Sequence, residues 1–302
     1  MARRVHRAGV LGLLTQAVRG ARPMCPGPAA PSVSDMNNHS AGPGGRPPQT
    51  PPLALVTGAS RGLGRALAAG LAREGYDLIL DARNAGDLNA AADEIRGAVT
   101  AIPGAVTAVP GAVTAIPGDV TDPAHRAALF RAAHHAGRLD LLVNNAGTLG
   151  ASPLPALADY PVDSLRTAFE VNVIAPIALT QLLLPLLRAS GGAVLNITSD
   201  AAVEAYAGWG GYGAAKAALE QASNVLAAEE LAVRVWWADP GDLRTDMHQA
   251  AFPGEDISDR PWPDTVVPAF TRLVAERLPS GRYRAAHLLP PAATGGQVHT
   301  GR

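Results

Sequence analysis

From Leu53 onward, short apolar runs alternate with longer stretches rich in Ala and Leu whose apolar residues recur at helical spacing. Short continuous apolar runs are typical of strands buried on both faces, as in a parallel sheet covered by helices. The repeated strand–helix order therefore predicts an α/β fold with a doubly wound parallel sheet. The expected strands include Leu53–Thr57, Asp77–Leu80, Leu139–Val143, Ala193–Thr198 and Val233–Ala238.

Composition excludes several functional classes. The 25 Lys and Arg residues balance 26 Asp and Glu residues, so no basic excess predicts a nucleic-acid partner. Cys25 is the single cysteine, which excludes an intramolecular disulfide and a Cys-based metal cluster. No apolar run reaches the ~18 residues of a membrane span. The eight histidines, including His134 and His135, lack metal-ligand spacing, so we expect solvated helix residues and no metal site. We expect a cytoplasmic protein without a membrane partner.

Residues 1–52 differ from the remainder of the chain. The first acid is Asp35, after an Arg-rich stretch with weak amphipathic spacing, and a Pro/Gly/Ser-rich segment follows. Such a beginning suits a transit peptide. An unstructured tail, or a true start at Met24 or Met36, also fits, because a Pro/Gly-rich segment cannot build a packed core. We expect a disordered tail over 1–52, one domain over 53–290, and a second disordered tail over 291–302.

A heptapeptide occurs three times in tandem, as Gly97–Pro103, Gly104–Pro110 and Gly111–Pro117. Because every copy contains Gly and Pro, a continuous helix through the repeats is excluded. Only the last copy leads directly into Gly118-Asp119-Val120, so the third strand is expected there. Residues 97–110 then represent an insertion that forms a surface loop.

A glycine-rich turn follows the first expected strand and precedes helical sequence from Arg65 to Arg73. Backbone N–H groups at the start of a helix lie at the positive end of its dipole, where a pyrophosphate can bind. The glycines allow a tight turn and close approach of the ligand, as in a Rossmann fold. The turn comprises Thr57, Gly58, Ala59, Ser60, Arg61, Gly62, Leu63 and Gly64.

The end of the second strand governs the choice of cofactor. An acid at this position binds the ribose 2′-hydroxyl groups of NAD, whereas an arginine accepts the 2′-phosphate of NADP. The chain has both, in Asp81 and Arg83. Ser60, Arg61 and Arg83 can together hold a phosphate dianion. Asp81 lies two residues earlier and is expected to point elsewhere, so NADP(H) is favoured over NAD(H).

With these features the chain resembles the short-chain dehydrogenase/reductase family. It contains the motifs of that family in order over about residues 53–247. The family's glycine pattern is met at Thr57, Gly58, Gly62 and Gly64. The later motifs are found at Asp119-Val120, Asn144-Asn145-Ala146-Gly147, Asn172, Ser199, Tyr212-x-x-x-Lys216, and Pro240-Gly241 with Thr245.

The resemblance implies a catalytic group of Ser199, Tyr212, Lys216 and Asn172. It implies cofactor contacts by Thr57, Gly58, Ser60, Arg61, Gly62, Leu63, Gly64, Arg83, Asp119, Val120, Asn145, Ala146, Gly147, Tyr212, Lys216, Pro240, Gly241 and Thr245. The residues themselves support this chemistry. Tyr212 and Lys216 are four apart and share one helix face. A neighbouring ammonium, together with the positive nicotinamide of the oxidised cofactor, is expected to draw the phenol's pKa down from about 10 toward the working range.

The expected function is hydride transfer between NADP(H) and a small-molecule carbonyl or secondary alcohol, in a homodimer or homotetramer. The alternative is an NADP(H)-binding regulator on the same fold with little or no turnover, because a fold alone does not settle function. Residues 246–264 are expected to form a mobile lid over the substrate. Trp209 is expected to be a packing residue. Its position shortly before Tyr212 would also allow it to touch the substrate. The chain lacks the family's frequent Asp-Gly-Gly ending, and Gly281–Arg284 is expected to lead into a last short strand.

Overall fold

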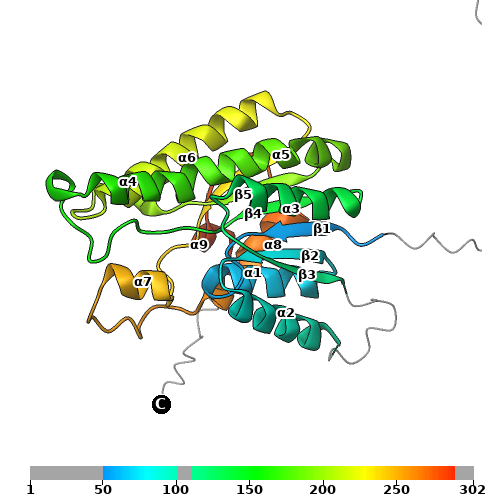
Figure 1. The fold of residues 1–302 in the computed structure, drawn as a ribbon, viewed down its shortest axis with the longest axis horizontal. Coiled ribbons are helices and arrows are strands. Elements are labelled where there is room, and N and C mark those ends of the chain that lie inside the picture. Colours follow the sequence, from blue (N-terminus) through cyan, green and yellow to red (C-terminus); the bar gives the residue numbers. More distant parts are fainter. Residues whose placement is uncertain (1–49, 101–110, 290–302) are drawn as a thin grey trace, which may run out of the picture. The chain divides into compact units, whose positions relative to one another are not determined.

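The computed structural model describes residues 50–100 and 111–289, and these contain a parallel sheet of seven strands (Figure 1). Their order across the sheet is β3-β2-β1-β4-β5-β6-β7, so the winding direction reverses between β1 and β4. Such a reversal opens a crevice beyond the carboxyl ends of the two strands. The strands are β1 (Leu53–Val56), β2 (Asp77–Ala82), β3 (Val113–Pro117), β4 (Leu141–Asn144), β5 (Ala193–Ile197), β6 (Arg234–Asp239) and β7 (Gly281–Arg284).

The doubly wound α/β fold is confirmed, and each expected apolar run supplies a strand. The last strand differs from the expectation. Residues 281–284 do not lead into a strand but are themselves β7, paired with β6 from Trp236–Gly281 to Asp239–Arg284. The reason is its position at the sheet edge, where a strand tolerates polar side chains such as Arg282 and Arg284, so an apolar pattern does not reveal it.

Helices cover both faces of the sheet, as Figure 1 shows. On one face lie α1 (Gly62–Arg73), α2 (Ala85–Thr100) and α8 (Val267–Ala275); on the other lie α3 (Pro123–His135), α5 (Ala175–Ser190) and α6 (Gly210–Glu229). The shorter helices are α4 (Val162–Phe169), α7 (Asp246–Ala251) and α9 (Ala285–Leu288). Four single turns are η1 (Leu157–Asp159), η2 (Glu170–Ile174), η3 (Asp200–Ala202) and η4 (Pro263–Val266).

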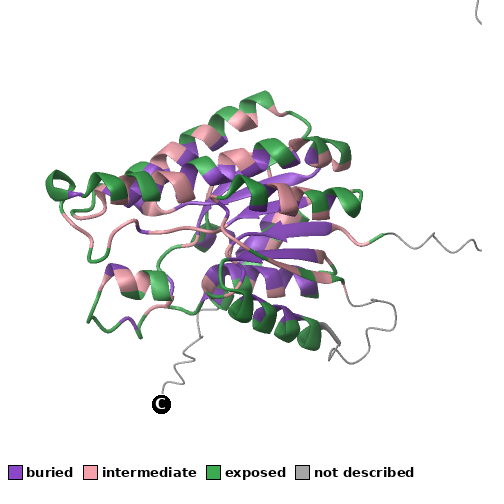
Figure 2. Cartoon of the chain, in the orientation of Figure 1, coloured by how far each residue is buried: buried purple, intermediate pink, exposed green. Residues whose placement is uncertain are grey.

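The sheet separates two apolar cores because successive strand residues point to opposite faces. In β1, Ala54 and Val56 enter the core under α1 and α8, whereas Leu53 and Leu55 enter the core under α3 and α5. All four residues of β1 are buried, and the central strands are buried throughout in Figure 2. This explains why the strands appear in the sequence as unbroken apolar runs.

One helical stretch, 162–190, is long and apolar enough to cross a membrane by length and composition alone. In the structure its last part, α5, places Leu179, Leu183 and Leu187 in the core beneath the sheet. Packing within the domain thus accounts for part of its apolar character, while Val162, Ile174 and Leu182 remain at least 40% exposed.

The heptapeptide repeat contributes to two elements. Its last copy forms β3, which pairs with β2 from Leu78–Val113 to Ala82–Pro117, so the expected third strand is confirmed. The expectation of a loop beginning at Gly97 is wrong, because α2 continues through residues 97–100. The first proline of the repeat is Pro103, and a single interior glycine costs a helix only about 1 kcal/mol. The remainder of the expected loop, residues 101–110, lies outside the described residues, as do nearly all of both expected tails.

We predict that Gly97→Ala stabilises the protein. The residue is exposed inside α2, and a Cβ built there meets no atom of the described residues within 4 Å. Replacing an interior helix glycine with alanine is worth about 0.5–1 kcal/mol. The free energy of unfolding, measured by urea titration, should rise by that amount.

Gly118→Ala is the matched control. Its Cβ would lie 2.1 Å from Nδ1 of the buried His125 side chain, so this variant should lose stability. A Gly97→Ala protein of unchanged or lower stability would contradict a helix at this position.

Candidate active site at the carboxyl edge of the sheet

The glycine turn joins β1 to α1 and is tightly closed. Gly58 and Gly62 have φ angles of +65° and +55°, which side chains disfavour. A Cβ on Gly64 would lie 2.3 Å from the Gly58 carbonyl oxygen, so the helix packs against the turn only because no side chain intervenes. Only glycine suits these positions.

Thr57 and Asn145 fasten this turn to the end of β4. The Thr57 hydroxyl oxygen accepts hydrogen bonds from the backbone N–H groups of Asn145 and Ala146, both at 3.0 Å. In return, Asn145 Nδ2 donates to the carbonyl oxygens of Thr57 (2.9 Å) and Gly58 (3.2 Å). The expected cofactor residues after β1 and β4 therefore meet at the point where the strand order reverses.

The start of α1 fits the pyrophosphate of a dinucleotide. Its N-cap residue, Arg61, makes no side-chain capping hydrogen bond, and the first turn contains no acid. The first N–H groups of a helix have no intrahelical partner, so here they remain available to an anion. Together with the close-packed glycines, these N–H groups fit the pyrophosphate that the sequence predicts at this turn.

Asp81 and Arg83, the two candidate cofactor residues at the end of β2, have different surroundings. Arg83 is exposed. Burial acts to raise the pKa of Asp119, but hydrogen bonds from Thr121 and the charge of Arg83 bring it below its ordinary value. Asp81 is 1% exposed, and its carboxylate lies 2.6 Å from Nε2 of His125. Asp81 thus points away from the exposed Arg83.

His125 corrects one expectation. It belongs to the histidines expected to be solvated on helices, but it is buried at the start of α3. His134 and His135 are exposed, as expected. Burial raises the pKa of Asp81, while the hydrogen bond from His125 acts in the opposite direction. This pair was not predictable, because its partners are 44 residues apart and belong to different elements.

Ser199, Tyr212 and Lys216 come together from two elements. Ser199 follows β5, and its hydroxyl caps η3 by accepting from the Ala201 N–H at 3.1 Å while donating to Asp200 Oδ1 at 3.0 Å. Tyr212 and Lys216 lie in the first turns of α6. The Lys216 ammonium nitrogen lies 5.5 Å from the centre of the Tyr212 ring and donates to the Ile197 carbonyl oxygen at 2.8 Å.

Burial sets the electrostatics of this group. It raises the pKa of Tyr212 well above the ordinary value, and the charges of Asp239 and Asp200 raise it further, whereas a hydrogen bond with Ser199 acts to lower it. Burial also lowers the pKa of Lys216 to about 8. The site therefore favours a neutral phenol and weakens the ammonium beside it. The expected lowering of the phenol's pKa by Lys216 is not found, because burial and the two carboxylates raise that pKa instead.

Asn172 lies in η2, a π-helical turn between α4 and α5. It is fully buried, and its amide accepts from the Thr148 N–H at 3.1 Å and donates to the Thr148 carbonyl oxygen at 2.8 Å. The side chain thus holds the loop that follows β4. Single π turns inside helices are frequent at functional sites, and this one packs against α6.

An apolar wall stands beside Tyr212. The Trp209 ring packs edge-on at 5.7 Å from the Tyr212 ring, and Phe252 lies 5.9 Å from Trp209. Phe252 belongs to the segment expected to form the lid, directly after α7. Asp246 in α7 pairs with Arg61 of the glycine turn at 2.8 Å, so this segment contacts both halves of the site.

The remaining expected residues surround the same edge. Thr245 caps α7 by accepting from the His248 N–H at 3.1 Å, and its methyl group lies 3.5 Å from where a Gly62 Cβ would be. A Cβ on Gly147 would lie 3.0 Å from Oδ1 of Asn172. Leu63 and Val120 are buried beneath the turns that carry them.

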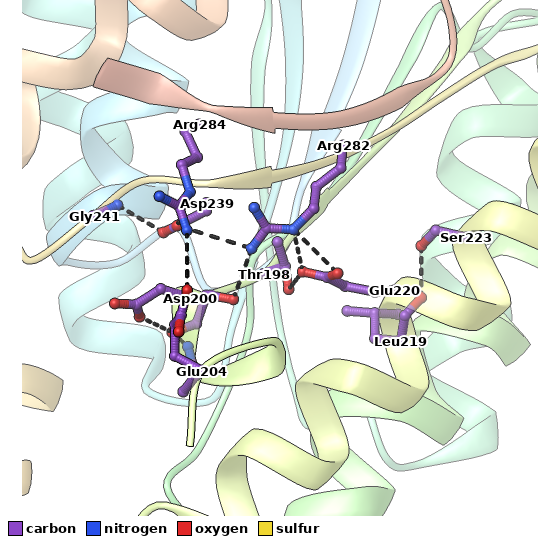
Figure 3. A network of polar contacts seen from close by, with 12 residues as sticks. Thr198, Asp200, Glu204, Leu219, Glu220, Ser223, Asp239, Gly241, Arg282 and Arg284 are labelled. Atoms are coloured by element: carbon purple, nitrogen blue, oxygen red, sulfur yellow. Dashed lines mark hydrogen bonds and ion pairs between the residues drawn. The ribbon is translucent and has the colours of Figure 1, made fainter. Parts of the chain in front are cut away.

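Next to Pro240 and Gly241 lies a cavity of about 270 Å³ that the sequence did not predict. Its charged lining comprises Asp200, Glu204, Asp239 and Arg284. Arg284 lies 3.8 Å from carboxylate oxygens of both Glu204 and Asp239 (Figure 3). No motif marks these positions, since the contacts join residues far apart in the sequence.

Comparisons with known proteins agree with this geometry. The pattern of the short chain dehydrogenase family matches residues 52–256. The uncharacterized oxidoreductase YciK of Escherichia coli is 33% identical over 226 residues, which cover 74% of this chain and 86% of that protein. Sepiapterin reductase of Rattus norvegicus is 35% identical over 66% of this chain and 77% of that protein.

Solved structures show the same likeness. A short chain dehydrogenase from Shigella flexneri, complexed with NADP, superposes with a TM-score of 0.70 at 30% identity. The match covers 78% of this chain and 97% of that one. Given the family pattern over residues 52–256 and relatives of this identity, the chain belongs to the short-chain dehydrogenase/reductase family.

Proposed function

We propose that the protein transfers a hydride between NADP(H) and a carbonyl or secondary alcohol, with Ser199, Tyr212, Lys216 and Asn172 as its reaction group. The observation that carries the proposal is the buried Tyr212–Lys216 pair on one face of α6, beside Ser199. A bound nicotinamide supplies or accepts the hydride, while the protein orients the reactants.

In this proposal, Ser199 and Tyr212 both interact with the substrate oxygen. The Ser199 hydroxyl turns its proton from Asp200 Oδ1 to the substrate and so holds a carbonyl oxygen beside the phenol. Tyr212 gives its proton to that oxygen during reduction and takes it back during alcohol oxidation. The buried phenol is neutral at ordinary pH and carries the proton to be donated, but its raised pKa makes it a weak acid, so the developing phenolate must be stabilised by nearby positive charge. The positive charge of an oxidised cofactor would favour the phenolate that oxidation requires.

Lys216 and Asn172 support this proton transfer. The ammonium of Lys216 stabilises a developing phenolate and, in the family's arrangement, also binds the cofactor ribose. Asn172 fixes the backbone at Thr148 and, by the family's arrangement, holds a water that links Lys216 to solvent. Trp209 and Phe252 exclude water from one side of the reacting atoms.

NADP(H) is the proposed cofactor. Two supports agree: the Shigella flexneri relative is complexed with NADP, and Arg83 lies exposed beyond β2 with Asp81 turned away toward His125. Arg61, which pairs with Asp246 at the surface, is the second proposed contact for the 2′-phosphate. Asp119 and Val120 are proposed to flank the adenine.

We further propose that residues 53–290 form the catalytic domain of a cytoplasmic homodimer or homotetramer. The helical stretch 162–190 supports self-association, because Val162, Ile174 and Leu182 are between 40% and 59% exposed on it. Light scattering of the purified protein tests this assembly, and a monomeric mass would contradict it.

Tyr212→Phe should abolish turnover and leave NADPH affinity nearly unchanged. The substitution removes the proton donor and little packing, and loss of general acid catalysis costs about 10²–10⁴-fold. Turnover is measured as NADPH consumption with a panel of ketones, 1,2-diketones and 3-oxoacyl thioesters, and affinity by NADPH fluorescence. Tyr283→Phe is the control, since this hydroxyl donates only to the Pro279 carbonyl. Equal rates in the two variants would remove Tyr212 from the mechanism.

Affinity for NADPH should fall as pH rises through about 8. Burial lowers the pKa of Lys216 to about this value, so its ammonium is present below that pH and is lost above it. A hydrogen bond from a charged donor is worth about 1.5–3 kcal/mol, or roughly tenfold or more in affinity. Titrations over a pH series measure the change. Lys216→Met should bind weakly with a flat profile, and a profile like that of the wild type would contradict the assignment.

The double substitution Ala82→Asp with Arg83→Leu should change the preference from NADP toward NAD. A carboxylate at position 82 repels the 2′-phosphate and accepts hydrogen bonds from ribose hydroxyls, while the loss of Arg83 removes a phosphate partner. The ratio of the two dissociation constants should change by about 100-fold. Arg73→Leu, at the exposed far end of α1, is the control. A wild-type protein that already binds NAD more tightly would refute the role of Arg83.

A further inference from the structure

Arg282 of strand β7 contacts the turn after β5 that begins at Ser199. It also contacts Glu220 of α6, the helix that carries Tyr212 and Lys216 (Figure 3). Its Nη2 donates to the carbonyl oxygen of Ser199 at 3.2 Å. Its Nε lies 2.9 Å and 3.1 Å from the two carboxylate oxygens of Glu220 in α6. The side chain is 24% exposed, so solvent screens these contacts only in part.

Glu220 extends the contact to the catalytic face of α6. It lies four residues after Lys216 and eight after Tyr212, so the three side chains share one side of the helix. Glu220 is 9% exposed, and its carboxylate also accepts from the Thr198 hydroxyl at 2.8 Å. Thr198 directly precedes Ser199, and so Glu220 and Arg282 bind the residues on both sides of the Thr198–Ser199 peptide.

We infer that Arg282 is a positioning residue for the reaction: it ties the Ser199 backbone to Glu220 of α6 and thereby fixes the serine relative to Tyr212 and Lys216. The inference rests on the proposed function. It assigns a role to an edge strand that carries none of the family motifs found in the sequence.

The turn after β5 depends on this contact. The Ser199 carbonyl oxygen accepts from Arg282 and also from the Ala202 N–H at 3.2 Å, while the Ser199 hydroxyl accepts from the Ala201 N–H. The orientation of that hydroxyl therefore follows the orientation of the turn. Because a misplacement of about 1 Å can cost a reaction ~100-fold, holding this turn against α6 has a direct effect on rate.

The neighbouring Arg284 provides a matched control. It belongs to the same strand, two residues on, and also carries a guanidinium near Asp239. Among the described residues it forms ion pairs with Glu204 and Asp239, both at 3.8 Å, and these pairs involve neither Ser199 nor α6. Arg284→Met thus removes the same charge from the same strand without breaking the link between the serine and the helix.

Four variants separate positioning from general stability. Arg282→Met breaks the link and leaves the buried Glu220 carboxylate unpaired, which destabilises a fold. Glu220→Gln combined with Arg282→Met removes both charges and should recover the melting temperature. Arg282→Lys keeps the charge but cannot span both partners, because one ammonium replaces a planar fork. Arg284→Met completes the set.

In turnover assays with the carbonyl panel, we expect kcat to fall about 100-fold in Arg282→Met and in the double variant, and about tenfold in Arg282→Lys. NADPH affinity and the substrate KM should change less than about threefold, since Arg282 is not a cofactor contact. Arg284→Met should lower kcat far less than Arg282→Met, because it acts only through the charge of Asp239 and leaves the link between Ser199 and α6 in place. If the double variant recovers kcat together with its melting temperature, or Arg282→Met matches Arg284→Met, the positioning role is refuted.

Hydrogen–deuterium exchange gives a readout that needs no substrate. In Arg282→Met and the double variant, the amides of residues 200–202 should exchange at least about tenfold faster, relative to peptides from β4, and Arg284→Met should not show this. Unchanged relative exchange at 200–202 overturns the inference. If the wild-type protein consumes NADPH with none of the carbonyl compounds, the proposed function is refuted instead. In that case the exchange rates still test whether Arg282 links the Ser199 turn to α6.

Discussion

Reciprocal hydrogen bonds between Thr57 and Asn145 join the carboxyl ends of β1 and β4, and the site is arranged around this junction. The strand order reverses here, so the helix after β1 and the loop after β4 leave toward opposite faces. One hydroxyl satisfies two backbone N–H groups that would otherwise lack partners at a crowded edge. The junction holds the glycine turn on one side, and on the other it holds the loop that Asn172 binds through Thr148.

Much of this arrangement was predictable from the sequence because its signals are local. The apolar runs mark strands buried on both faces, and the four-residue spacing of Tyr212 and Lys216 places them on one helix face. The contacts of Arg282 with Glu220 and of His125 with Asp81 could not be predicted, because these partners are 62 and 44 residues apart and no spacing rule connects them. The bounds of the edge strand β7 were not predicted for a related reason. Its alternate residues, Arg282 and Arg284, face other charged groups, so the strand has no apolar pattern.

Charge around Tyr212 is unevenly distributed. Asp200 and Asp239 both raise its pKa, and burial acts in the same direction. Arg282 and Arg284 from β7 favour the ionised form of Asp239, even though burial raises the pKa of that carboxyl. The outermost strand therefore helps to keep the charge on Asp239, one of the two carboxylates that raise the pKa of the phenol. The phenol therefore keeps its proton at ordinary pH, and a further positive charge brought near it makes that proton easier to remove.

The repeat at β3 has a consequence for how the chain tolerates changes in length. β3 is an edge strand, and its five residues recur in the preceding copy with one isoleucine replaced by valine. Gain or loss of a whole seven-residue unit therefore leaves next to β2 a strand that differs by no more than one methylene group. The entropy of closing a connection rises by only about 0.6 kcal/mol per doubling of its length. Copy number in this segment can drift among descendants of the chain while the pairing with β2, and the Asp119 turn that follows it, keep the same residues.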